Sequence, residues 1–206
     1  MSAARFPVQR HVWMQVPCEP ADDILVIFGD SQSFGHNPVM HSLTTEQLVL
    51  RPPEDSDFEV YKSFFSNREA SRYYGGPLRP DQAWRVLASH LGHWQLRGYG
   101  MWMIVPGESG EPVGGCGFVW PEGWPRRELT WWLMPEARGR GIAVEASRTA
   151  IRHAYDHYGW PRAETHMSDD NIAAKRLVQK LDGTEIAREI FPDGETRTVY
   201  ELPRPD

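Results

Sequence analysis

The stretch Met134–Ala146, MPEARGRGIAVEA, places two arginines and two glycines between a proline and an apolar run with helical spacing. A helix N-terminus offers unpaired amide N–H groups and about half a positive charge, so it attracts anions. Gly139 and Gly141 permit positive φ and a close approach of the backbone to a phosphate. Arg138 and Arg140 add charged donors. We predict that this turn binds a pyrophosphate. The alternative is a plain glycine-rich link between a strand and a helix, with solvated arginines.

Two other phosphate-binding motifs do not fit this turn. A P-loop needs Lys followed by Ser or Thr after its second glycine, and the chain has Ile142 and Ala143 there. A dinucleotide fingerprint needs a third glycine or alanine, inside a parallel unit of strand, helix and strand. Val144 is too bulky for that position, and the segments before the turn have the short links of an antiparallel meander.

Patterning divides the chain into an N-terminal arm at 1–42 and a regular domain at 43–206. The arm is turn-rich and aperiodic, and we expect it to pack on the domain or on a second subunit. The pattern of residues in the domain predicts a strand, two helices, three strands, a helix, a strand, a helix and two strands, in that order. The expected strands lie at 46–52, 101–106, 112–120, 128–134, 162–168, 184–190 and 195–203, and the expected helices at 55–66, 81–97, 139–157 and 171–181.

Composition is that of a globular protein, with 206 residues, 40% hydrophobic and 24% charged. A net charge of −6 argues against nucleic acid or an anionic membrane as the main partner. No apolar run approaches the ~20 residues of a membrane span, and the start of the chain lacks the apolar core of a signal peptide. Cys18 and Cys116 form no metal or disulfide pattern, so we expect a cytoplasmic protein without a metal.

The Gln/Arg-x-x-Gly-x-Gly/Ala signature of the GNAT N-acetyltransferase superfamily resembles Arg138 to Ala143. The stretch from Glu128 to Ala146, followed by DDNIAAKRLVQKLDG, looks like the branch of ribosomal-protein N-terminal alanine acetyltransferases. The resemblance runs from about Thr44 to Pro203. It implies an α+β fold of GNAT type, in which helices flank a mixed, mostly antiparallel sheet with a splayed central strand pair.

The resemblance also implies acetyl-CoA as the donor of an acetyl group to a primary amine. Main-chain amides from Arg138 to Ala143 would hold the pyrophosphate, the strand at 131–134 would pair with the pantetheine arm, and an N–H near Leu133 would polarise the thioester carbonyl. Asn171 matches an asparagine near the pantetheine, and Lys175 or Arg176 could reach the adenosine phosphates. The implied donor-binding residues are Trp131, Trp132, Leu133, Met134, Arg138, Gly139, Arg140, Gly141, Ile142, Ala143, Asn171 and Arg176.

The chain departs from the family pattern after Asn171. Ala174 stands where a serine is frequent, and Val178 stands where many members have a thiolate-protonating tyrosine. Asp182 and Gly183 replace a usual Gly-Phe pair. These changes leave the donor site intact and the general acid unassigned.

Acetyl transfer needs a neutral amine, so a general base contributes, usually through a water. Glu128 is the first candidate because it opens the splayed strand, and a structural hydrogen bond is the alternative role. His166 and Ser168 on the next strand are secondary candidates. Aromatic residues that could line the acceptor cleft are Tyr73, Tyr74, Trp84, Trp102, Trp120 and Trp124.

Three functions are open at this point. The first is an N-acetyltransferase that acts on a protein N-terminus or a small amine, for which a homodimer is one expected assembly. The second is a module on the same fold that binds acyl-CoA without turnover. The third, a nucleic-acid-associated protein that uses the local arginine cluster, conflicts with the net charge.

Overall fold

The structure, a computed structural model, describes residues 40–206. The arm predicted at 1–42, with Cys18, falls almost wholly outside these residues, and its proposed packing stays a prediction. The strands are β1 (Leu43–Thr44), β2 (Leu48–Arg51), β3 (Met101–Pro106), β4 (Gly114–Val119), β5 (Glu128–Leu133), β6 (Ala163–Met167), β7 (Thr184–Ile190) and β8 (Thr196–Leu202). The α-helices are α1 (Phe58–Ser66), α2 (Pro80–Arg97), α3 (Ile142–Asp156) and α4 (Ile172–Lys180).

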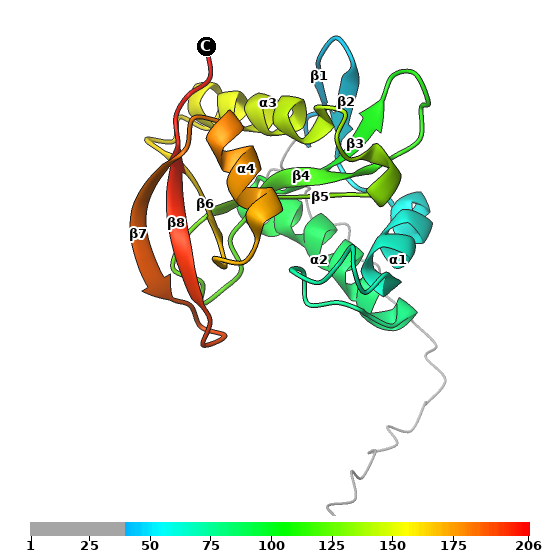
Figure 1. The fold of residues 1–206 in the computed structure, drawn as a ribbon. Coiled ribbons are helices and arrows are strands. Elements are labelled where there is room, and N and C mark those ends of the chain that lie inside the picture. Colours follow the sequence, from blue (N-terminus) through cyan, green and yellow to red (C-terminus); the bar gives the residue numbers. More distant parts are fainter. Residues whose placement is uncertain (1–39) are drawn as a thin grey trace, which may run out of the picture. The chain divides into compact units, whose positions relative to one another are not determined.

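The strands form two antiparallel sheets, in the orders β1-β2-β3-β4-β5 and β6-β8-β7. The break lies between β5 and β6, which are neighbours in space but form no continuous ladder (Figure 1). At one point the strands still touch, because the Thr165 hydroxyl donates to the Leu129 carbonyl over 2.8 Å. This is the splayed central pair, and the predicted fold class is confirmed.

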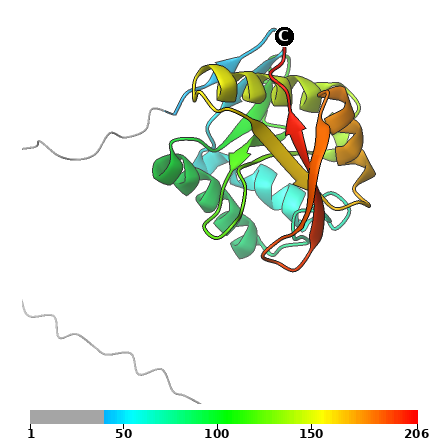
Figure 2. The same cartoon turned by 90° about the vertical axis from the view of Figure 1, so that its left-hand side faces the viewer.

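Helices cover both faces of the first sheet, with α3 on one side and α1 and α2 on the other, while α4 packs beside α3 (Figures 1 and 2). Strand alternation explains the division. On β3, Trp102 and Ile104 join the core under α3, while Met101 and Met103 join the core under α1 and α2. On β5, Trp132 packs under α1 and α2, where Gly115 of β4 leaves room for its indole.

The helix after the opening stretch begins at Ile142, three residues later than the sequence pattern predicted. Gly139 and Gly141 have φ of 78° and 83°, which is left-handed backbone that cannot belong to an α-helix. A Cβ at either glycine would meet no other atom within 4 Å. The glycines are therefore required by backbone conformation and not by crowding.

Among the described residues, no helix combines the length and apolar character that crossing a membrane requires.

Candidate active site

Two cavities open at the splay between β5 and β6, and they share a boundary. The first has a volume of about 580 Å³ and lies between the 138–144 turn, β5 and α4. The second has a volume of about 670 Å³ and lies between β5, β6 and the β7–β8 hairpin. The residues common to both are Arg72, Tyr73, Tyr74, Trp131, Asp170, Asn171 and Ala174. We call the first the donor cavity and the second the acceptor cavity.

The donor cavity brings together most of the residues predicted to bind the donor. Those that line it are Trp131, Leu133, Arg138, Gly139, Gly141, Ile142, Ala143, Asn171 and Arg176. Trp132 is 2% exposed under α1 and α2, Met134 packs on the same side, and the Arg140 guanidinium pairs with Glu108. These three do not line the cavity.

Helix geometry leaves unpaired amides at the floor of the donor cavity. Val144 and Glu145 both donate to the Gly141 carbonyl, so the amides of Ile142 and Ala143 have no intrahelical acceptor. Four cations line the cavity against two carboxylates. The cations are Arg72, Arg138, Arg176 and Lys180. Amides at a helix N-terminus within a positive surface make an anion site.

The edge of β5 that faces the splay has its carbonyls satisfied by side chains. Thr165 donates to the Leu129 carbonyl, the Tyr74 hydroxyl to that of Trp131, and Arg138 Nε to that of Leu133 over 3.1 Å. Because N–H and C=O of one residue point to the same side of a strand, the amides of Trp131 and Leu133 also face the splay. This edge of β5 therefore offers free backbone N–H donors to the cavity, while the carbonyl acceptors beside them already have hydrogen-bond partners.

The acceptor cavity holds Glu128 beside His166, two of the residues considered as a base from the sequence. Glu128 Oε2 lies 3.1 Å from His166 Nε2. Burial raises the pKa of the Glu128 carboxyl to about 8, partly opposed by the positive charge of Arg197. Burial lowers the pKa of His166 to about 4, assisted by Arg197. Near pH 7 Glu128 is therefore mostly protonated and His166 is neutral, so the pair has no net charge.

The rest of the acceptor cavity has an acidic excess and an aromatic wall. Asp170, Asp193 and Glu195 face two arginines, Arg72 and Arg197, and Glu128 is mostly protonated near pH 7. Tyr73, Tyr74 and Trp124 line it as predicted from the sequence. Of the other aromatic candidates, Trp102 is fully buried in the core, and Trp84 and Trp120 lie outside this cavity.

The structure gives Tyr74 a role that the sequence did not indicate, and it adds Arg197, which the sequence did not single out. Tyr74 was expected only as a cleft wall, yet its hydroxyl binds the β5 backbone at the junction of the cavities. Arg197, held by Asp193 over 2.6 Å, approaches the ring of Trp124 at 5.6 Å and influences both Glu128 and His166. Ser168 lines the acceptor cavity, and Lys175 pairs with Asp169 outside both cavities.

On α4, Val178 is 1% exposed and belongs to the core, and it does not line the donor cavity. No group of three or more His, Cys, Asp or Glu residues within 40–206 is arranged to hold a metal ion.

Comparison with known proteins adds independent findings. The model of a family described as the acetyltransferase (GNAT) domain matches residues 47–184. The uncharacterized N-acetyltransferase YoaA of Bacillus subtilis (strain 168) is 28% identical over 142 residues, which are 68% of this chain and 80% of YoaA. An acetyltransferase from Agrobacterium tumefaciens str. C58 superposes with a TM-score of 0.74 at 29% identity, over 85% of this chain and 99% of that one.

A more distant structure contains the coenzyme. RimL, a ribosomal L7/L12 alpha-N-protein acetyltransferase in complex with coenzyme A, has a TM-score of 0.65 at 16% identity, over 81% of this chain and 100% of that one. At this identity the likeness concerns the fold.

Proposed function

The chain belongs to the GNAT acetyltransferase family, and on this premise we propose that it transfers an acetyl group from acetyl-CoA to a primary amine by direct attack of the amine on the thioester. The observation that carries the proposal is the meeting of two cavities of opposite charge at Trp131. One is positive and built around a helix N-terminus, and the other has an acidic excess that suits an ammonium group.

The residues of the donor cavity fit coenzyme A. Amides of Gly139, Gly141, Ile142 and Ala143, with Arg138, would hold the pyrophosphate, because each either lines the cavity or donates into it. The β5 edge offers N–H donors at the place where an extended pantetheine arm would add to the strand. Asn171 caps α4 by accepting from the Ala174 amide over 3.1 Å, which fixes its side chain at the boundary of the cavities.

Acetyl-CoA supplies an activated acyl carbon, and the protein must stabilise the oxyanion that forms when the amine attacks. The splay-facing amides of Trp131 and Leu133 are suited to this role because fixed backbone dipoles need no reorganisation. Tyr74 and Arg138 keep the adjacent carbonyls occupied, so the developing negative charge meets donors.

Glu128 is the proposed general base. A carboxyl with a pKa of about 8 matches an α-amine with a pKa near ~8 better than an ordinary glutamate does. An arriving ammonium group would lower the pKa of Glu128 and favour its ionised form. His166, neutral at this pH, lies with its Nε2 atom 3.1 Å from Glu128 Oε2 and adds no positive charge beside the carboxyl. The acceptor class extends from protein N-termini, as in the ribosomal-protein branch, to small amines.

Release of free thiol from acetyl-CoA tests the function against a panel of α-amino peptides, polyamines and amino sugars. We expect turnover with at least one amine, and at least a hundredfold less with Glu128→Gln if general base catalysis has its usual magnitude of about 10²–10⁴. Tight CoA binding without turnover on any amine would support the binding module instead.

A further inference from the structure

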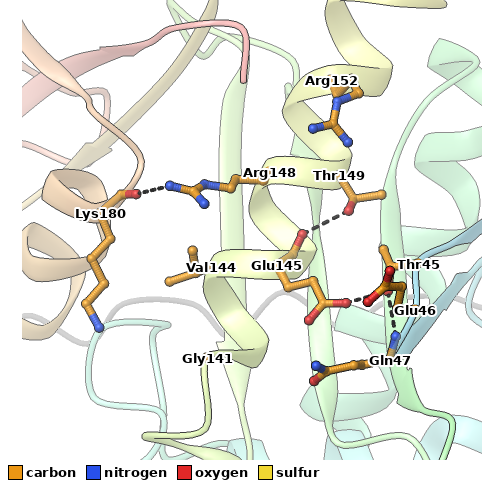
Figure 3. Close-up of a pocket in the computed structure, with 10 residues that line it drawn as sticks. All are labelled: Thr45, Glu46, Gln47, Gly141, Val144, Glu145, Arg148, Thr149, Arg152 and Lys180. Carbon is orange, nitrogen blue, oxygen red and sulfur yellow. Dashed lines mark hydrogen bonds between the residues drawn. The ribbon is translucent and has the colours of Figure 1, made fainter. Parts of the chain in front are cut away.

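A cavity at the beginning of β5 and β6 stands apart from the two that meet at the splay. By contrast, a cavity of about 670 Å³ along the exposed side of α3 (Figure 3) adjoins the donor cavity, because Gly141, Val144 and Lys180 line both. The cavity at β5 and β6 has a volume of about 230 Å³ and shares no lining residue with any of these three. We call it the Arg127 cavity, and a ligand in it would be distinct from the coenzyme and the acceptor.

The loop at 120–127, between β4 and β5, forms one wall of the Arg127 cavity and is held at both ends. At its start, the Trp120 amide donates to His93 Nε2 of α2 over 2.7 Å. Near its end, the Arg126 guanidinium pairs with Glu164 of β6 over 3.0 Å. A wall fixed in this way is already formed before a ligand arrives, which lowers the entropy that binding costs.

Arg127 is the one arginine of this cavity without a carboxylate partner among residues 40–206. Arg126 and Arg162 both pair with Glu164, over 3.0 and 3.3 Å. The guanidinium carbon of half-buried Arg127 instead lies 4.0 Å from the centre of the Trp160 ring, and its side chain makes no hydrogen bond within the described residues. A guanidinium that stacks on an aromatic ring keeps its in-plane N–H groups free for an anion. The cavity therefore offers a single cation to a ligand.

Much of the remaining lining is aromatic or apolar. Phe118 packs edge-on against Trp160, with ring centres 5.0 Å apart, which fixes the ring that Arg127 covers. Trp120 and Pro125 of the loop also line the cavity, and Trp120 is 36% exposed. An apolar cavity of about 150 Å³ is enough for benzene, so a volume of about 230 Å³ has room for one ring with a carboxylate.

Charge inside the cavity favours a ligand with a single negative charge. Glu164 lines the cavity with a side chain that is 10% exposed. A second negative charge on the ligand would meet this carboxylate, so a phosphate monoester, with a charge of about −1.5 to −2, fits less well. One carboxylate can take the free edge of Arg127 in the two-bond geometry that arginine commonly forms.

We propose that the Arg127 cavity binds a small aromatic carboxylate, with the carboxylate on the Arg127 guanidinium and the ring against Trp120, Pro125 and Trp160. The inference goes beyond the proposed function and does not depend on it, because none of these residues lines the donor or the acceptor cavity.

Titration followed by the tryptophan indole N–H signals in proton–nitrogen NMR spectra tests the proposal. The probes are benzoate, benzamide as the neutral counterpart with the same ring, and acetate as the carboxylate without a ring. We expect benzoate to shift the signals of Trp120 and Trp160, assigned with Trp120→Phe and Trp160→Phe, with a Kd on the order of 1 mM for a ligand of this size. Benzamide and acetate should bind about tenfold more weakly, because each lacks one of the two kinds of contact.

Four variants locate the binding site. Arg127→Gln should weaken benzoate about tenfold and leave benzamide unchanged, and Trp120→Leu should weaken both, because it removes part of the aromatic wall. Arg85→Gln removes one exposed charge from α2 as the matched control, and Arg138→Gln tests the donor cavity as the competing site. Circular dichroism checks that each variant is folded, and either of the first two variants alone decides the outcome.

Equal binding of benzoate and benzamide would overturn the assignment of a carboxylate to Arg127, and equal binding of benzoate and acetate would overturn the aromatic class. An affinity for benzoate that Arg127→Gln and Trp120→Leu leave unchanged would overturn the site itself, as would the absence of any shift at Trp120 and Trp160. Loss of benzoate binding in Arg138→Gln alone would also overturn it, by moving the anion to the donor cavity. Each of these outcomes leaves the proposed function standing.

Discussion

Glu128 offers the sharpest test of the site, because its carboxyl is partly buried beside His166 and its pKa is raised from an ordinary 4.5 to about 8. About one tenth of the molecules then carry an ionised Glu128 at pH 7, and about nine tenths at pH 9. If the ionised form is the base, kcat/KM should rise about tenfold between these pH values. An acceptor amine with a pKa below about 6 is needed, so that its own ionisation adds nothing to the profile.

The same pKa has a consequence for stability that requires no substrate. A carboxyl whose pKa is raised on folding stabilises the native state below its unfolded value of 4.5, and this contribution is lost as the pH rises to about 8. The wild type should therefore lose stability relative to Glu128→Gln by up to about 1.4 kcal/mol per pH unit across that interval. Above pH 8 the difference should level off.

Glu128→Gln is a suitable variant because glutamine imitates the protonated, neutral acid that predominates at pH 7. Chemical denaturation at pH 5, 6, 7 and 8 measures the stability difference, and initial rates of thiol release measure the kinetic profile. A stability difference that does not change with pH would show that the carboxyl titrates normally. A wild-type rate profile that Glu128→Gln reproduces would remove Glu128 from the role of base.

Three further perturbations follow from the geometry. Burial lowers the pKa of His166 to about 4, so the protein should lose stability as the pH falls from 6.5 toward 4, and the His166→Gln variant should lose less. Thermal melts across this pH range measure the difference, and equal acid sensitivity of the two proteins would contradict the lowered pKa. Gly141→Ala places a Cβ on backbone with φ of 83°, which should lower stability by about 1 kcal/mol and weaken CoA binding. Thermal melts and calorimetry measure the two effects, and an unchanged melting temperature would refute the backbone strain. Arg126→Ala leaves Glu164, whose side chain is 10% exposed, with Arg162 as its remaining ion-pair partner. The free energy of unfolding, measured with denaturant, should fall by about 2 kcal/mol, against less than about 1 kcal/mol for Arg79→Ala at an exposed ion pair. Equal losses in the two variants would show that burial does not matter there.

The sequence predicted the elements well wherever one short pattern decides them. The expected strands at 101–106 and 184–190 coincide with β3 and β7, because alternation and flanking turn residues suffice to define them. β1 was missed since two residues carry no periodicity. The turn at 138–143 was predicted because its glycines, arginines and following helix are contiguous in the chain.

The partners across the splay could not be predicted from the sequence. Tyr74 and Trp131 are 57 residues apart, Thr165 and Leu129 are 36 apart, and Arg148 and Lys180 are 32 apart. Nothing in the local pattern specifies these pairs, because each depends on how the two sheets and α4 pack. Aromatic residues were ambiguous for the same reason: Trp102 fills the core, whereas Trp124 lines the acceptor cavity.

Strand geometry limits how Glu128 can act. A strand rises about 3.3 Å per residue, so Glu128 and Leu133 are about 16 Å apart along β5, while Glu128 and Trp131 are about 10 Å apart. A carboxylate cannot contact an amine placed at the Leu133 amide, so the proton must pass through water, for which the acceptor cavity has room. Trp131 lines both cavities and Leu133 only the donor cavity, so the route is shortest when the amine attacks beside Trp131. The Tyr74 hydroxyl on the Trp131 carbonyl then lies next to the reacting atoms.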